Sequence, residues 1–431
     1  MKRNILLCFL LVALPQWMGA VVQPSSAMSM AARRVLNPVC PVTLASVHEH
    51  FAVYCQPGGG FAVISNDDDM PAVLAYSLDG KFSSRDGNPG YEWWLRAAEK
   101  SMTRNNSPRL STTLPDPARF PASVAPLITT RWGQREPFKF MCPFDHYVAD
   151  ISLYGTYMPD EGHCVAGCGP VAMAQYMNYY KFPKHGSGSE SIVVKYDQGN
   201  VTLTVDFDAA TYDWANMIDD YQGDYTDVQG EAVARLCYHC GVASLATYNS
   251  LGAGTTDARI VDAFINHFNY NQGAHYVSRA NYSEPTWMEM LYTELSAGHP
   301  VLYSAKDLNL ELGIIAGHNF IIDGYDENGL VHVNWGWYGF ENGYFDIALL
   351  NVQQYTYDDW QAMYVGLYPN REALIGDING DDAVDVADVV ALIDIVLNGS
   401  SGYDLTMIDL NHDNQVDVAD VTALIGIVLN G

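Results

Sequence analysis

The amino-acid sequence predicts an α+β protein built from several folding units. Three observations support this prediction: short apolar runs separated by glycine and acidic clusters near the N-terminus, a glycine-rich turn that leads into a helix with alternating strands far downstream, and a duplicated helical segment at the C-terminus. At 431 residues the chain is long enough for about three domains.

The composition indicates a chain that can bury a large core, and its charge limits which molecules it can bind. Hydrophobic residues make up 48% and charged residues 17%, which is enough to bury a large core. The chain has 22 basic and 50 acidic residues, for a net charge of −28. Because this charge repels phosphate backbones and anionic lipid, we expect no nucleic-acid partner and no binding to a membrane surface.

The first twenty residues predict a secretory signal peptide, residues 1–20. Lys2 and Arg3 precede an apolar run over residues 5–14, and cleavage after Ala20 or after Ala27 fits the small-residue rule. No later stretch reaches the ~20 apolar residues that span a bilayer. We therefore expect no transmembrane segment and a secreted protein, either extracellular or associated with the cell surface; an uncleaved N-terminal anchor is the alternative.

Residues 21–120 predict a small α+β unit. The runs FAVYC, GFAVIS and AVLAYS are typical of strands in a small sheet, and a helix is expected over residues 91–102. Residues 103–122 contain four prolines and have the composition of an exposed linker. From these patterns alone, the unit could be an ordinary β-rich accessory domain.

The run GHCVAGCGPVAMAQYMNYYKFP, residues 162–183, predicts a glycine-rich turn that enters a helix. Pro170 suits the first helical turn, and Pro183 ends the helix. Cys168 therefore lies at a helix N-terminus, where unpaired amides and the helix dipole favour an anion and lower the pKa of a thiol. This position makes Cys168 a candidate nucleophile.

A thiolate nucleophile needs an imidazole partner that later donates a proton. His318 lies in AGHNFIIDGY, which predicts a strand, and a second strand, VHVNWGW, supplies Asn334 and Trp335. The order Cys, His, Asn over this distance is that of papain-like proteases, in which an amide holds the imidazole and an aromatic ring shields the pair. The rival bases are His163 and His332.

The remaining cysteines allow more than one interpretation. Of eight cysteines, Cys8 lies in the signal peptide, so seven remain and at least one thiol is unpaired or joined to another molecule. Cys237 and Cys240 have redox-pair spacing, but we expect either core residues at a helix end or a strained local disulfide. Cys164 is either a resolving thiol under oxidation or simply buried.

The C-terminus contains a duplicated unit with a period of 32 residues. Residues 384–399 and 416–431 share fourteen of sixteen residues, and in each copy Asp and Asn side chains occupy positions 1, 3, 5, 9 and 12 of a calcium-loop pattern. The predicted ligands are Asp377, Asn379, Asp381, Asp385 and Asp388 in the first loop and Asp409, Asn411, Asp413, Asp417 and Asp420 in the second. We expect two structural Ca²⁺ sites and no cofactor for catalysis; a metal-free acidic tail is the alternative.

The motifs GCGPVAMAQYMNYYKFP, AGHNFIIDGY and HVNWGWYG together resemble the streptopain family of secreted cysteine peptidases, over about residues 25–368. The resemblance implies a papain-like catalytic domain at residues 121–368, with a helical half and an antiparallel sheet half, that cleaves protein or peptide substrates as an endopeptidase. The segment HEHFAVYCQPGGGFAVISNDDDMPAVLAYSLDGKF is similar to the family's prosegment. Residues 21–120 would then be the enzyme's own inhibitor, cut away within the linker.

Carried over by position, the resemblance implies that Cys168 is the nucleophile and His318 the general base and acid. It implies that Gln134 in RWGQREPF is the oxyanion-hole side chain. Trp335 matches the aromatic residue beside the histidine, with Asn334 next to it. The chain departs from the family in having Gly-Pro after the nucleophile, where Val-Ala is common.

The repeat, with Asp at position 12, resembles the dockerin family, in which each loop is followed by one helix. This resemblance covers residues 375–431 and implies a cohesin-like or surface partner. Two other classes stay open. One is a non-catalytic scaffold or adhesion protein that acts through the repeat while the thiol is inert. The other is acyl transfer to an amine, as in transglutaminases.

Overall fold

The structure is a computed structural model. It describes residues 25–67, 70–80, 82, 88–104, 112–144, 162–196, 199–249, 252–309, 314–347, 359–370, 376–379, 384–399, 408–411, 413 and 415–430. The expected signal peptide and the predicted ligand Asp381 lie outside these residues, and so does part of the linker.

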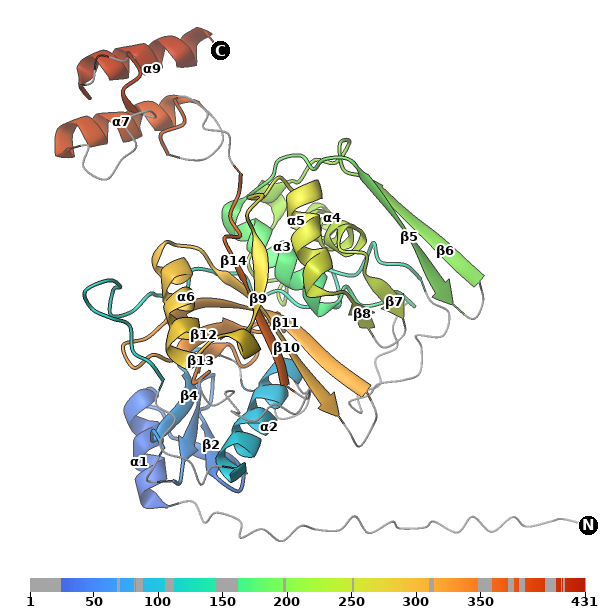
Figure 1. Ribbon diagram of the computed structural model, residues 1–431, viewed down its shortest axis with the longest axis vertical. Helices are drawn as coiled ribbons and strands as arrows, with labels where there is room; N and C mark the ends of the chain where they lie inside the picture. The colour runs from blue at the N-terminus through green and yellow to red at the C-terminus, as the bar shows by residue number, and fades with distance from the viewer. Residues whose placement is uncertain are drawn as a thin grey trace, which may run out of the picture.

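One antiparallel sheet of ten strands organises the described part of the chain (Figure 1). Its strand order is β1-β2-β3-β4-β13-β12-β11-β10-β14-β9. The N-terminal strands are β1 (Thr43–Val47), β2 (Phe51–Cys55), β3 (Phe61–Ser65) and β4 (Val73–Ser77). The others are β9 (His275–Ser278), β10 (Val301–Asn309), β11 (Ile314–Tyr325), β12 (Val331–Asn334), β13 (Gly343–Phe345) and β14 (Asp359–Val365).

Helices cover both faces of this sheet, which confirms the α+β class. One apolar cluster joins α3 (Cys168–Tyr180), α4 (Asp227–Ala243) and α5 (Asp257–His267) to one face. A second cluster joins α2 (Pro89–Arg104) and α6 (Glu284–Ser296) to the other face. The helix expected at 91–102 forms and is slightly longer than predicted, and the helix expected after the glycine-rich turn also forms.

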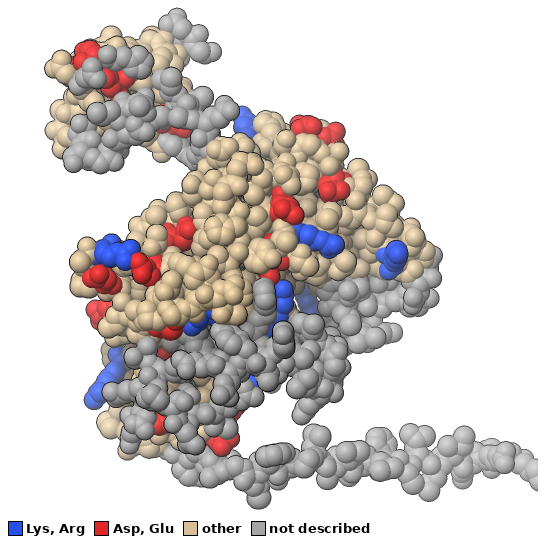
Figure 2. Space-filling model, viewed as in Figure 1, with Lys and Arg blue, Asp and Glu red and all other residues tan. Residues whose placement is uncertain are grey.

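Smaller elements complete the body. The ribbon of β5 (Ser189–Tyr196) and β6 (Gly199–Asp206) projects from the helical side in Figure 1. The pair β7 (Thr247–Asn249) and β8 (Gly252–Gly254) follows α4, and short 3₁₀ turns lie at Trp214–Asn216 and Arg279–Asn281. On the face shown in Figure 2, acidic and basic side chains are interspersed, and the visible Lys and Arg do not merge into one basic surface.

The four N-terminal strands do not form the separate small sheet expected from the sequence. Strand β4 pairs with β13, with Tyr76 opposite Tyr344 and Ala75 opposite Phe345, so the N-terminal strands extend the larger sheet. The physical reason is that β13 would otherwise be an open edge with unpaired N–H and C=O groups. Helix α1 (Ser26–Val35) packs against β2 and β3 and covers one side of this extension.

The C-terminal repeats form two helices, α7 (Val386–Asn398) and α9 (Val418–Asn430), side by side at one end of the molecule (Figure 1). They pack through a small core in which Leu392 and Leu424 are fully buried. The expected helix after each loop is therefore present. Among the described residues, no helix is both long and apolar enough to span a bilayer.

Candidate active site

Cys168 is the first residue of α3, as the glycine-rich turn predicted. The preceding Gly167 has φ +92°, and a Cβ there would lie 2.6 Å from the carbonyl oxygen of Ala253. Only glycine meets both demands, the left-handed backbone and the close approach. Pro170 falls in the first helical turn, where no intrahelical N–H donor is needed.

The surroundings of Cys168 favour its thiolate. Burial raises the pKa of the Cys168 thiol, but the hydrogen bond with His318 and the charge of that imidazole oppose burial, as do the backbone amides of Asn319 and Gly169. The net result is a pKa below the ordinary thiol value of 9.0. The position at the start of α3 adds the helix dipole in the same direction.

His318 lies in β11, opposite Ala305 of β10, and only 6% of its surface is exposed. Its Nε2 donates a hydrogen bond of 2.7 Å to the backbone carbonyl of Trp335. A neutral imidazole with the proton on Nε2 has its lone pair on Nδ1. The carbonyl therefore selects the tautomer whose Nδ1 can take the proton of the thiol.

The amide of Asn334 does not hold the imidazole. Its Nδ2 donates to the carbonyl of Thr130 at 2.8 Å, and its Oδ1 accepts from the amide of Gly336 at 3.1 Å. The acceptor for His318 is the next residue's backbone carbonyl instead. Because a carbonyl is present at every position, the sequence had no signal for this contact.

Trp335 lies beside His318, with the two ring centroids 6.4 Å apart. Its indole is buried, and Nε1 donates to the carbonyl of Glu341 at 3.0 Å. The residue thus contributes twice, by its ring next to the imidazole and by the carbonyl that holds Nε2.

Gln134 lies next to the turn that precedes Cys168. Its backbone carbonyl accepts from the amide of Ala166 at 2.9 Å, and the residue is half-buried. This backbone bond joins the segment around Gln134 to the segment that carries the sulfur.

The two rival histidines have other partners. Nδ1 of His163 lies 2.7 Å from the carbonyl of Cys142, and Nδ1 of His332 lies 2.5 Å from Oδ1 of the buried Asp323. The sequence favoured His318 but left two rival histidines open, and these contacts leave His318 as the imidazole beside Cys168.

Within the described residues, none of the other core cysteines forms a disulfide. Cys237 and Cys240 are buried in α4 as free thiols, which agrees with the expectation of core residues. Cys164 is also a buried thiol, with its Sγ 3.4 Å from the hydroxyl of Tyr196. Burial raises the pKa of both α4 thiols, so they are poor nucleophiles.

Comparison with known proteins identifies the relatives of this chain. Residues 132–345 match the model of the Peptidase C10 family, and residues 44–102 match that of the Spi protease inhibitor. The chain is 36% identical to a fragment of prointerpain A from Prevotella intermedia, with a TM-score of 0.66, covering 77% of this chain and all of that one. The chain belongs to the peptidase C10 family.

Other relatives agree with the assignment of this chain to the C10 family. Active interpain A from Prevotella intermedia is 37% identical with a TM-score of 0.52, covering 59% of this chain and 99% of that one. Streptopain of Streptococcus pyogenes is 27% identical over 334 residues, covering 74% of this chain and 80% of that protein. The chain thus contains an inhibitory prosegment followed by a cysteine peptidase.

In this C10 peptidase, the start of α2 lies directly on the site. A Cβ at Gly90 would lie 2.7 Å from Cδ2 of His318 and would also overlap the Trp335 ring. Asn88 caps α2, accepting on Oδ1 from the amides of Gly90 and Tyr91, and its Nδ2 donates to the carbonyl of Phe340 at 2.9 Å. The prosegment helix is thus fixed over the imidazole by packing and by hydrogen bonds.

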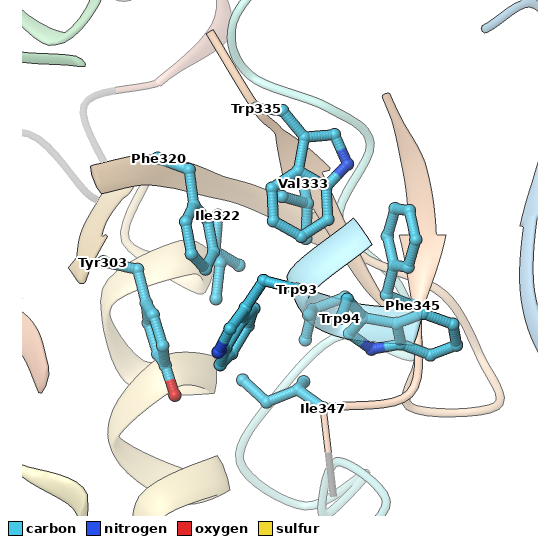
Figure 3. A pocket seen from close by; sticks show the side chains of 10 residues that line it. Trp93, Trp94, Tyr303, Phe320, Ile322, Val333, Trp335, Phe345 and Ile347 are labelled. Atoms are coloured by element: carbon cyan, nitrogen blue, oxygen red, sulfur yellow. The ribbon is translucent and has the colours of Figure 1, made fainter. Parts of the chain in front are cut away.

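The next residues of α2 line an apolar pocket together with side chains of the C10 peptidase (Figure 3). Trp93 and Trp94 point into it from the helix, and Trp94 Nε1 donates to the carbonyl of Asp346 at 3.2 Å. The side chains on the peptidase side are Tyr303, Phe320, Ile322, Val331, Val333, Trp335, Phe345 and Ile347. Sequence reasoning missed these contacts because the tryptophans only indicated an apolar helix face.

The two C-terminal loops have the same backbone pattern. Asp388 accepts from the amides of Ile378, Asn379 and Asp385, and Asp420 accepts from the equivalent Leu410, Asn411 and Asp417. Both position-12 carboxylates are fully buried, and Asp377 and Asp409 are 8% exposed. Within the described residues, however, no group of three Asp, Glu, His or Cys side chains is arranged to hold a metal.

Proposed function

We propose that this peptidase is a secreted cysteine endopeptidase made as an inactive precursor, with Cys168 as nucleophile and His318 as general base and acid. The observation that carries the proposal is the Nε2 bond of His318 to the Trp335 carbonyl, which leaves Nδ1 for a thiol whose pKa is already lowered. The expected signal peptide supports secretion.

In the first step the Cys168 thiolate attacks the peptide carbonyl and the C–N bond then breaks. His318, protonated by the thiol, gives its proton to the leaving amine. The backbone amide of Cys168 and the side chain of Gln134 hold the oxyanion. Water, deprotonated by His318, then releases the acyl group and restores the thiol and the imidazole.

Substitutions at Cys168 and Gln134 test these roles. Cys168→Ala should abolish hydrolysis of an internally quenched peptide, and Gln134→Ala should lower kcat by about a hundredfold or more. His332→Gln is the matched control, because it removes a histidine that contacts Asp323 instead of the sulfur. Unchanged hydrolysis in the Cys168→Ala protein would overturn the proposal, and release of ammonia from glutamine substrates would favour acyl transfer to amines instead.

We propose that the prosegment blocks the active site until the peptidase removes it by self-cleavage. Helix α2 covers His318, and the described linker residues 112–122 are half-buried or exposed, which suits proteolysis. The native precursor should lose residues up to about 120, while the Cys168→Ala precursor stays full length. Equal shortening of both would mean that another protease does the processing.

A second proposed function belongs to residues 375–431, a dockerin-like module with two Ca²⁺ sites and a cohesin-like or surface partner. Its support is the ligand spacing in the sequence and the identical amide pattern around Asp388 and Asp420. If the ion binds, the loop carboxylates and Asn oxygens would hold it in a structural role.

Calorimetric titration of the intact protein with Ca²⁺ tests this module. Two sites are expected, with one lost in Asp377→Ala and the other in Asp409→Ala. Removing Ca²⁺ with a chelator should melt α7 and α9 and leave hydrolysis of a short peptide nearly unchanged. No heat of binding would refute the Ca²⁺ sites, and parallel loss of turnover would refute independent modules.

A further inference from the structure

Asn319 follows His318 in β11 and contacts the reacting sulfur. Its Oδ1 lies 3.9 Å from Sγ of Cys168, oriented to accept a hydrogen bond from the thiol, and its backbone amide lowers the pKa of the same thiol. Its Nδ2 is buried and has no hydrogen-bond partner among the described residues. A buried amide donor without a partner is rare and calls for an explanation.

The explanation lies in the two charge states of Cys168. When the sulfur carries a proton, S–H donates to Oδ1, as observed. When the proton has moved to His318, an amide oxygen facing the negative sulfur would repel it. A half-turn about the Cβ–Cγ bond of Asn319 brings Nδ2–H to the sulfur and breaks no existing Nδ2 hydrogen bond within the described structure.

We propose that Asn319 is a further catalytic residue of this site. Its side-chain amide can turn, so that Oδ1 accepts a hydrogen bond from the Cys168 thiol and Nδ2 donates one to the Cys168 thiolate. The proton of the thiol passes to Nδ1 of His318, so Asn319 gains and loses none. A hydrogen bond to a charged acceptor is stronger than one between neutral groups, and the thiolate is therefore favoured.

The space beside the amide fits this role. A Cβ at Gly169 would lie 3.6 Å from Oδ1 of Asn319 and 2.7 Å from Cγ2 of Thr255. The glycine that departs from the family pattern therefore adjoins the side chain that has to turn. Among the described residues, the buried hydroxyl of Ser304, opposite Asn319 in the β10–β11 register, also has no hydrogen-bond partner.

The inference rests on the proposed function, and the test separates the two. The pKa of Cys168 is measured from the pH dependence of iodoacetamide labelling in the full-length protein, with the labelled peptide identified by mass spectrometry and Cys168→Ser as blank. Asn319→Leu, which keeps the size and removes the donor, should raise this pKa. Asn319→Asp should raise the pKa of Cys168 further through like-charge repulsion. Asn319→Ser can still donate a hydrogen bond, so its Cys168 pKa should lie between those of the Leu variant and the unmodified protein.

Kinetics on the processed enzyme supply the second readout. Below the pKa of the thiol, Asn319→Leu should lower kcat/KM roughly tenfold with little change in KM, since one charge-assisted hydrogen bond is lost. Asn200→Leu, on an exposed strand position, is the matched control and should change neither quantity.

Each outcome decides one claim. A labelling pKa that is the same in folded Asn319→Leu, Asn319→Asp and unmodified protein would overturn the role of Asn319. A pKa that depends on Asn319, in a protein without Cys168-dependent hydrolysis, would sustain the amide contact and refute the proposed peptidase mechanism.

Discussion

The N-terminal region, residues 43–104, and the C-terminal repeats, residues 376–430, differ in where their apolar side chains lie. Through α2 and one face of its strands, the first shares a core with the peptidase: Trp93 and Trp94 pack with Phe320 and Phe345 in one cluster. The second has a small core of its own between α7 and α9. The helices of the two regions have similar lengths. Helix content alone therefore does not reveal which region controls the active site.

The difference teaches what each region can do. A region whose core is shared cannot leave without exposing apolar surface on the peptidase, so its binding is coupled to the state of the site. A region with its own core can fold, bind and be removed separately. Inhibition is therefore expected from residues 43–104, and a tethering role from residues 376–430.

The largest expected effect is loss of prosegment docking in Trp94→Ala. Removing a fully packed tryptophan destabilises by about 3–5 kcal/mol, and here the cavity opens at the junction with the peptidase. In the Cys168→Ala background, the variant precursor should be cleaved by added mature enzyme far faster than its parent. Cleavage is followed by gel electrophoresis.

The control for Trp94→Ala is Trp214→Ala, whose Nε1 donates to the carbonyl of Pro183 on the helical side. It should lower the stability of the peptidase without hastening prosegment removal. If both variants are cleaved at the same raised rate, general instability explains the result and the shared core does not control inhibition.

For the C-terminal repeats, we predict that Leu392→Ala unfolds the repeats without affecting the active site. Loss of this fully buried side chain costs about 2–5 kcal/mol, which is enough to unfold a core this small. Peptide hydrolysis and prosegment removal should be unchanged. Limited proteolysis followed by mass spectrometry would show cuts confined to residues 376–430, and cuts in the peptidase would contradict the separation.

The active-site pair could be predicted from the sequence, whereas the contrast between shared and separate cores could not, and the reason is physical. Cys168 and His318 were predictable because a helix start and a strand pattern fix their local geometry. The contact of Gly90 with His318 was not, because it joins residues far apart in the chain through tertiary packing. The acceptor carbonyl of Trp335 and the shared sheet edge are backbone features, which side-chain motifs do not report.

Acid should loosen the peptidase body through His239 in α4. Burial, with a smaller contribution from Arg235, lowers the pKa of His239 to about 4 from 6.5. Below pH 6.5 the unfolded chain takes up this proton more readily than the folded one. Stability is therefore complete above pH 6.5 and falls as the pH drops toward about 4, by up to about 3 kcal/mol.

Urea unfolding of the intact protein between pH 7 and pH 4, followed by tryptophan fluorescence, measures this loss. His239→Gln removes the titrating group, so its stability should depend less steeply on pH in this window. An identical pH dependence in both proteins would show that other groups are responsible.

The smallest expected effect separates the caps of the two regions. Asn88 caps α2 and also donates to Phe340 of the peptidase, whereas Asp385 caps α7 by accepting from Ala387 within its own repeat. Asn88→Ala and Asp385→Ala should each cost about 1 kcal/mol of helix stability. Only the first should also raise the rate of prosegment cleavage, by a few-fold, because only its cap is bonded to the peptidase. If Asp385→Ala accelerated that cleavage equally, the repeats would be coupled to the active site and the contrast between shared and separate cores would fail.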